Sequence, residues 1–166
     1  IIAKTIIHCH KNFNKRMMVL FTSRAQLEST LTLLKQMNRE NELPIFAQKR
    51  QTSRMGLIRG MKQSKNGILL GTNAFWEGVD LPGNLLEVLI IIKMPFDVPT
   101  DPIVKAYSGM IEAQGGNSFM DYALPESIIR FRQGFGRLIR TSYDEGIFIV
   151  MDDRVISKRY GAMFSE

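Results

Sequence analysis

Five short stretches of the chain are apolar throughout, and this pattern constrains the fold more than any other feature. They cover residues 17–21, 43–47, 67–71, 88–92 and 147–151. A strand that is apolar at every position is typical of a parallel sheet buried on both faces. Because segments with helical spacing separate these strands, the sequence predicts an α/β fold with a mostly parallel sheet, helices on both faces and right-handed crossovers.

Helical spacing of apolar residues predicts three helices in the first part of the chain. The first covers residues 1–14, the second follows a cap at Thr22 or Ser23, and the third follows Thr52 or Ser53. The residues expected to face inward are Ile2, Ile6, Ile7 and Cys9 in the first helix and Leu27, Leu31, Leu34 and Met37 in the second.

The pattern loosens in residues 95–126, where prolines and a glycine pair interrupt it. The interrupting residues are Pro95, Pro99, Pro102, Gly115, Gly116 and Pro125. We interpret this segment as an irregular helical excursion and not as a second domain. With 166 residues, the chain is expected to form a single domain, residues 1–166.

The excess of positive charge is confined to one stretch. Of 22 basic residues, six lie between Leu43 and Trp76, where there is no acidic residue, and the other 16 balance the 16 acidic residues. This basic strip consists of Lys49, Arg50, Arg54, Arg59, Lys62 and Lys65. It predicts a contact surface for a polyanion such as nucleic acid, and a solvated helix face is the alternative.

The location of the protein is predicted from what its composition lacks. No apolar run approaches the roughly 20 residues of a membrane span, so no membrane partner is expected. Cys9, the one cysteine, has no partner for an internal disulfide, which favours the cytoplasm. The first residues contain neither an initiator Met nor a signal sequence, so we expect a piece of a longer protein. The run His8-Cys9-His10 is expected on a helix surface, without a metal.

The segment 133–140 predicts a helix with two chemically different faces. At about 100° per residue, Gln133, Arg137 and Arg140 share one side. The opposite side holds Ile128, Phe131, Phe135, Leu138 and Ile139. Gly136 borders the polar side, where the missing side chain allows a close approach. The polar side suits a phosphate group, and a solvated basic face is the alternative.

The loop after the third strand, residues 71–83, combines glycines with two carboxylates. Glu77 and Asp80 could act as an acid/base pair, bind a metal, or accept hydrogen bonds from a ribose and from arginines. Phe75 and Trp76 are expected to be core anchors. Since ligands bind at the carboxyl ends of parallel strands, this loop and those at 22–24, 48–52 and 152–154 are candidate ligand loops.

These segments together resemble the second motor domain of superfamily two helicases, in the branch that includes DinG and XPD. Residues 19–23 resemble motif IV, residues 71–83 resemble motif V, and residues 133–140 resemble motif VI. Pro95-Phe96 and the prolines after it also resemble the branch. The sequence departs from the pattern at Arg24, where an aromatic is frequent, and at Ala74, where Ser is frequent.

The resemblance implies a RecA-like fold and a role for each matching residue. Arg137 and Arg140 would reach the γ-phosphate of ATP as arginine fingers, and Gln133 would sense it or orient the attacking water. The residues implied at the ATP site are Glu77, Gly78, Asp80, Gln133, Arg137 and Arg140. Those implied to bind single-stranded DNA are Thr22, Ser23, Arg24, Lys49, Arg50, Gly71, Thr72 and Asn73.

Several helicase parts are missing from this sequence. It has no phosphate-binding loop of the Gly-Lys-Ser/Thr kind, and Asp144-Glu145 is followed by Gly146-Ile147 and not by an acid box. ATP and Mg²⁺ are therefore expected to bind mainly to a first motor domain of the same protein, and this piece alone is expected to be inactive. Cys9 alone excludes a four-cysteine iron–sulfur cluster in these residues.

The resemblance predicts an ATP-dependent DNA helicase that acts in DNA repair, with a fused 3′–5′ exonuclease domain left open. Two alternatives remain. One is a nucleic-acid-binding module of a nuclease without an active motor, to which Ala74 lends some support. The other is an unrelated doubly wound nucleotide-binding domain, which would bind ATP by itself.

Overall fold

The computed structural model describes residues 1–166 except 39–41, 50, 73–84, 140–142 and 165–166, and it does not describe the side chain of Arg137. The chain divides into two compact units. The sheet unit contains Ile1–Lys93 and Phe135–Asp152, and the helical unit contains Met94–Gly134 and Asp153–Glu166. A single domain over residues 1–166 stays a prediction.

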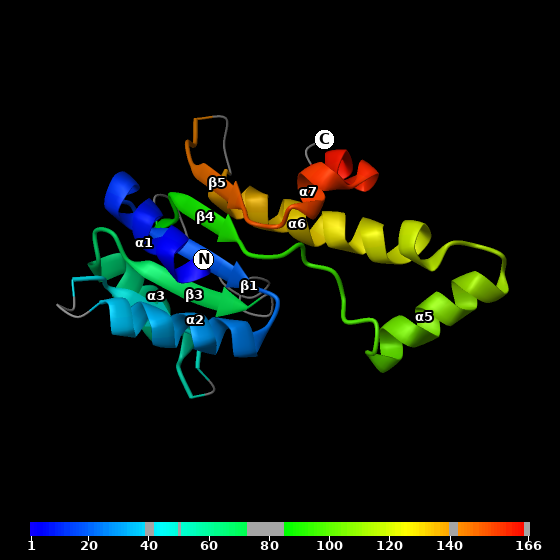
Figure 1. Cartoon of the computed structure of the whole chain (residues 1–166), viewed down its shortest axis with the longest axis horizontal. Helices are drawn as coiled ribbons and strands as arrows, with labels where there is room; N and C mark the ends of the chain where they lie inside the picture. The colour runs from blue at the N-terminus through cyan, green and yellow to red at the C-terminus, as the bar shows by residue number, and fades with distance from the viewer. Residues whose placement is uncertain (39–41, 50, 73–84, 140–142, 165–166) are drawn as a thin grey trace. The chain divides into compact units, whose positions relative to one another are not determined.

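In the described part of the chain, the sheet unit is built on a parallel sheet of five strands. Figure 1 labels β1, β3, β4 and β5 of this sheet. They are β1 (Met17–Phe21), β2 (Ile45–Ala47), β3 (Ile68–Thr72), β4 (Val88–Ile91) and β5 (Ile147–Val150). Their order in the sheet is β2-β3-β1-β4-β5, and each neighbouring pair is parallel. Every residue of the central strand β1 is buried, whereas the edge strand β5 is half-buried. The predicted α/β class and parallel sheet are confirmed.

Among the described residues of the sheet unit, helices cover both faces of the sheet. α1 (Ile2–Phe13) and α2 (Arg24–Met37) share one apolar core with alternate residues of the strands. The buried residues of α3 (Arg54–Gln63), Leu57 and Met61, are not part of that core. That core includes Ile6, Leu27, Leu34, Met17, Val19, Phe21, Ile68 and Leu70. Since side chains alternate along a strand, Met18 and Leu69 point to the opposite face, where a right-handed crossover places α3.

The structure corrects two predictions about buried residues. His10 was expected on a helix surface, but it is only 7% exposed. Cys9, for which the sequence offered both an inward and a surface position, is 5% exposed and faces inward. His10 is satisfied in the interior because its Nε2 lies 3.0 Å from the carbonyl oxygen of Asn66. Burial raises the pKa of the Cys9 thiol. Met37, expected to face inward, is 45% exposed at the end of α2.

The helical unit contains the predicted excursion, which is more regular than expected. Its helices are α5 (Pro102–Ala113), η2 (Phe119–Ala123), α7 (Arg154–Ser157), η3 (Arg159–Phe164) and the first part of α6 (Leu124–Leu138). α5 begins where Asp101 accepts a hydrogen bond from the N–H of Ile103 at 2.9 Å and Pro102 occupies the first turn. Within the described residues, no helix has the length and apolar character needed to cross a bilayer.

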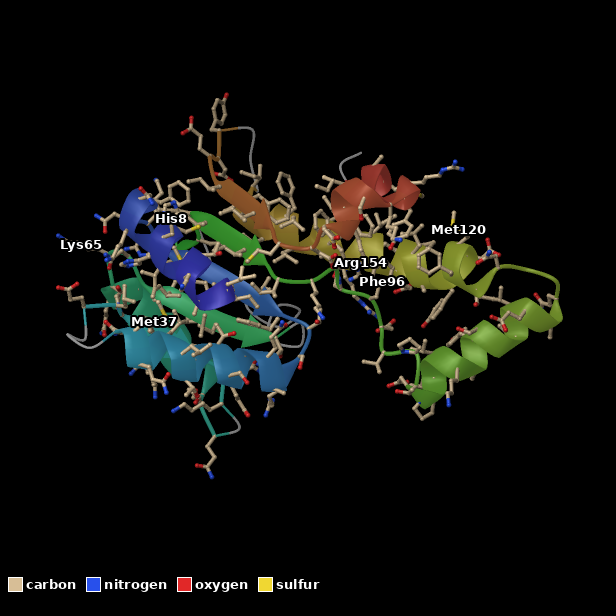
Figure 2. The ribbon with its side chains drawn as sticks, in the orientation of Figure 1. His8, Met37, Lys65, Phe96, Met120 and Arg154 are labelled. Carbon is tan, nitrogen blue, oxygen red and sulfur yellow. The ribbon has the colours of Figure 1, made fainter. Side chains whose placement is uncertain are left out.

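An aromatic cluster forms the centre of the helical unit. The ring of Phe96 lies 5.8 Å from that of Phe119 and 6.3 Å from that of Phe164, which also contacts Phe131 at 5.3 Å. The guanidinium of Arg154 lies 5.1 Å from the centroid of Phe96, and the two side chains are seen together in Figure 2. This cation–π contact and the ring contacts join the segment after β4 to the C-terminal helices.

Candidate functional site

The carboxyl edge of the sheet brings together residues that are distant in the sequence. Phe21 at the end of β1 pairs with Thr72 at the end of β3, and Ala47 at the end of β2 pairs with Leu70. The chain therefore leaves all three strands at one edge, at Thr22, at Gln48 and after Thr72. This edge is where ligands bind in parallel α/β sheets.

The loop after β1 ends in a capped helix, as the sequence predicts. Ser23 has an extended backbone, and its side-chain oxygen accepts a 3.4 Å hydrogen bond from the N–H of Gln26. Ser23 is thus the N-cap of α2, and Thr22 is half-buried beside it. Arg24, the first residue of α2, is exposed and adds a cation to the same edge.

Gln48 and Thr72 form a pair at this edge that the sequence reasoning missed. The Oε1 atom of Gln48 accepts hydrogen bonds from the backbone N–H of Thr72 at 2.9 Å and from its hydroxyl at 3.0 Å. Gln48 was placed in a candidate ligand loop but not among the contact residues. Its position directly after a predicted strand, at the carboxyl edge, was the signal that pointed to it.

The other predicted DNA contacts differ in where they lie. Lys49 is exposed beside Gln48, whereas Gly71 is buried within β3, where it pairs with Leu20. Arg50 and Asn73 lie outside the described residues. The rest of the basic strip, Arg54, Arg59, Lys62 and Lys65, is exposed along and after α3. The structure therefore gathers Thr22, Ser23, Arg24, Lys49 and Thr72 near one edge, and it leaves their role as DNA contacts a prediction.

The two-faced helix is present, but it is shorter than predicted. α6 ends at Leu138, whereas the prediction extended the helix to residue 140. Ile128, Phe131 and Leu138 are buried, as expected for the apolar face. Phe135 is 43% exposed and is not a core residue, although its ring packs edge-on against Phe148 at 5.4 Å.

The polar face of α6 is open where the structure describes it. Gln133 and Gly136 are exposed, and a Cβ added at Gly136 would meet no described heavy atom within 4 Å. The side chain of Arg137 and the whole of Arg140 lie outside the described part of the chain. The exposed amide of Gln133 and the uncrowded Gly136 are each compatible with the approach of a phosphate group.

The predicted acidic loop lies outside the described residues from residue 73 onward. This applies to Phe75, Trp76, Glu77, Gly78 and Asp80, so their assignments stay predictions. Across the described residues, no group of three or more His, Cys, Asp or Glu side chains is arranged to hold a metal ion.

Residues 6–166 match the family model of the helicase C-terminal domain. The chain belongs to this family. The match covers residues of both the sheet unit and the helical unit. Together with the relatives and solved structures described next, it confirms the predicted DinG/XPD-like helicase C-terminal domain.

Two relatives with similar sequences carry the name DinG. The chain is 40% identical over 147 residues to the ATP-dependent DNA helicase DinG of Photobacterium profundum, which corresponds to 87% of this chain and 21% of that protein. It is 37% identical over 155 residues to the 3′-5′ exonuclease DinG of Bacillus subtilis, covering 93% of this chain and 17% of the relative. The chain thus spans about a fifth of the length of the curated relatives it matches.

Solved helicases share the fold of this domain. An XPD helicase superposes with a TM-score of 0.77 over 98% of this chain and 29% of its own, at 18% sequence identity. Domain 2 of the Mss116p DEAD-box helicase gives a TM-score of 0.55 over 96% of this chain and 54% of its own, at 17% identity. At these identities the likeness concerns the fold alone, and it confirms the predicted RecA-like architecture.

Proposed function

We propose that this chain is the second motor domain of a DinG-type, ATP-dependent DNA helicase. In this proposal residues 1–166 act as one domain that binds single-stranded DNA and completes an ATP site shared with a first motor domain of the same protein. The observation that carries the proposal is the parallel register of β1 and β3, which puts Thr22 and Thr72 at one ligand-binding edge. The family membership of the chain supports the motor class.

The DNA strand would follow the carboxyl edge of the sheet. Hydroxyls, backbone N–H groups and exposed cations hold phosphates without reading the bases, which suits a motor that moves along any sequence. Thr22, Ser23, Arg24 and Lys49 supply such groups among the described residues, and Thr72 lies beside them at the end of β3. Arg50, Gly71 and Asn73 complete the proposed set, and the exposed basic residues of α3 would attract the strand by charge.

The ATP site would be completed by the polar face of α6. Arg137 and Arg140 would neutralise the charge that develops on the transferred phosphoryl group, and Gln133 would orient the attacking water. The open space at Gly136 would let the nucleotide come close to the helix. Glu77, Gly78 and Asp80 would link the ATP site to the DNA-binding edge of the sheet.

The remaining parts of the ATP site would come from the first motor domain. ATP and Mg²⁺ would bind mainly there, because the present sequence has no phosphate-binding loop. The isolated chain is therefore expected to hydrolyse no ATP. The cytoplasmic location stays a prediction, and so does a fused 3′–5′ exonuclease, an activity that the name of the Bacillus subtilis relative suggests.

Substitution of the arginines in the full-length protein tests the proposal. Arg137→Ala and Arg140→Ala are each expected to lower DNA-stimulated ATP turnover by about a thousandfold, the effect typical of an arginine finger, while single-stranded DNA binding is retained. Arg159→Ala, which removes an exposed arginine from η3, is the matched control and should leave turnover unchanged. Normal turnover in both finger variants would overturn the assignment.

A further inference from the structure

The side-chain amide of Gln48 has an orientation that its neighbours determine. Oxygen and nitrogen of an amide are assigned from the hydrogen-bond network, and here the backbone N–H of Thr72 decides the assignment. A backbone N–H can only donate, so the Gln48 atom that lies 2.9 Å from it must be the carbonyl oxygen Oε1. The Nε2 group therefore points away from the backbone of Thr72.

The same contact determines the state of the Thr72 hydroxyl. Oε1 of Gln48 is an acceptor without a proton, so the hydroxyl at 3.0 Å must be the donor. A hydroxyl has one proton, and in this arrangement that proton is used within the protein. Thr72 then offers lone pairs to its surroundings, and lone pairs do not bind the oxygens of a phosphate.

The donors that remain in this pair belong to Gln48. Its Nε2 carries two N–H groups, and no acceptor for them is found among the described residues. Gln48 is only half-buried, so a ligand at the edge can reach it. Its backbone is held in place because its N–H donates to the carbonyl oxygen of Leu70 at 2.9 Å. The neighbouring Lys49 is exposed and favours an anion.

We propose that Gln48 is a further DNA-binding residue, whose Nε2 donates to a backbone phosphate oxygen of the single strand while its Oε1 holds Thr72. This inference rests on the proposed function, because it assumes that a single strand follows the carboxyl edge. The Gln48 amide then has two functions. Its Oε1 holds the end of β3 through Thr72, and its Nε2 supplies the hydrogen-bond donor that the Thr72 hydroxyl does not provide. A neutral donor of this kind recognises phosphate without regard to base sequence.

Two substitutions at Gln48 separate donation to DNA from support of Thr72. Gln48→Glu keeps an oxygen that accepts both Thr72 hydrogen bonds but removes the N–H donors. Gln48→Met keeps the length of the side chain and removes donor and acceptor without adding charge. Gln36→Glu, at an exposed position near the end of α2, is the control for the amide-to-carboxylate change. All are made in the full-length protein, and binding of oligo(dT) is measured at pH 7.5 and constant salt.

The expected result is weaker DNA binding in both Gln48 variants. A hydrogen bond to a charged group typically accounts for about a tenfold change in affinity or more, so Kd should rise at least tenfold in each, with the Gln36→Glu value unchanged. Hydrogen exchange of the β3 amides should stay as in the wild type for Gln48→Glu, because the Thr72 bonds are retained.

Three results would overturn the inference. Normal binding by Gln48→Glu with weak binding by Gln48→Met would mean that Gln48 only positions Thr72. Weak binding by Gln48→Glu alone would mean that repulsion by the new charge is the cause. Normal binding by both Gln48 variants would mean that Gln48 does not contribute to DNA binding. Failure of the wild-type protein itself to bind oligo(dT) is a separate result, since it would overturn the proposed function.

Discussion

Asp97 and Arg130 are joined by a 2.5 Å hydrogen bond between Oδ1 and Nη1, which links the segment after β4 to the middle of α6. Nη2 of the same arginine lies 4.0 Å from a carboxylate oxygen of Glu126, one turn earlier in the helix. The side chains of Asp97 and Arg130 are 23% and 28% exposed, so water screens the pair only in part. Gln133 lies three residues beyond Arg130 on α6, so the ion pair supports the helix that carries the proposed ATP-site face.

Replacing Asp97 by Asn should loosen this part of α6. The substitution keeps a hydrogen-bond acceptor but removes the charge, and about 1 kcal/mol of local stability should be lost once solvent screening is considered. In hydrogen-exchange mass spectrometry of the full-length protein, the α6 amides should exchange about fivefold faster. Glu28→Gln, at an exposed position of α2, is the control. Unchanged exchange in α6 would show that Asp97 does not hold the helix.

Gly136→Ala should separate stability from catalysis. Alanine fits at this open position and favours a helix over glycine by about 0.5–1 kcal/mol, so exchange of the α6 amides should slow. ATP turnover should fall nonetheless, because the added methyl group occupies the space in which we place the nucleotide. Gly109→Ala is the matched control, since Gly109 lies within α5 and an added Cβ there also meets nothing within 4 Å. Unreduced turnover in Gly136→Ala would contradict a close approach at this position.

The ion pair of Lys15 and Glu87 should contribute stability that depends on pH. Partial burial acts to raise the pKa of Glu87. The hydrogen bonds from Lys15 Nζ at 2.9 Å and from the N–H of Arg16 at 3.1 Å act to lower it, and together with the positive charges of these two residues they have the larger effect. The pKa of Glu87 therefore lies below its ordinary value of 4.5. A carboxylate of this kind stabilises the fold above its unfolded-state pKa, and the contribution is lost as the pH falls through the lower folded-state pKa.

Comparison of the wild type with Glu87→Gln at several pH values measures this contribution. The difference in hydrogen-exchange protection of β4 should be constant at neutral pH. It should shrink as the pH falls through and below about 4.5, the ordinary pKa at which Glu87 is half protonated in the unfolded chain. After correction for the intrinsic exchange rate, a difference that grows toward acid pH would contradict the sign of the shift.

Gly60→Ala should destabilise the contact between α3 and β2. A Cβ at Gly60 would overlap the ring of Phe46, and such overpacking typically costs about 1–3 kcal/mol, which exceeds the gain in helix propensity. Gly56→Ala in the same helix is the control, because its Cβ would lie 3.8 Å from that of Ser53, an ordinary contact. Faster exchange of the β2 and α3 amides is expected for Gly60→Ala alone. Equal behaviour of the two variants would mean that Phe46 moves aside at little cost.

The strands were predictable because burial on both faces leaves a local pattern. β1 has the predicted limits, β4 and β5 each end one residue earlier than predicted, and β3 is shifted by one residue at both ends. β2 begins two residues later than predicted, at Ile45. The side chain of Asn38 bonds both the N–H and the carbonyl oxygen of Leu43, so Leu43 belongs to a side-chain contact and not to the ladder.

The functional side chains were predictable only as far as their chemistry is local. Ser23 follows from the capping preference of serine before a helix, and the exposure of Gln133 follows from the spacing of apolar residues along α6. The burial of His10 could not be foreseen, because its partner, the carbonyl of Asn66, is 56 residues away. Nothing in the spacing near His10 indicates an acceptor at that distance.

By itself, the sequence determined the parallel α/β class, the five strands and the helicase family, because these follow from short apolar runs and from motifs in a given order. The tertiary structure decided which polar groups meet. Gln48 and Thr72 are 24 residues apart, and they touch only because β2 and β3 are neighbours in the sheet. A hydrogen bond requires two atoms within about 3 Å, and that proximity comes from strand order and register, which no local pattern of residues specifies.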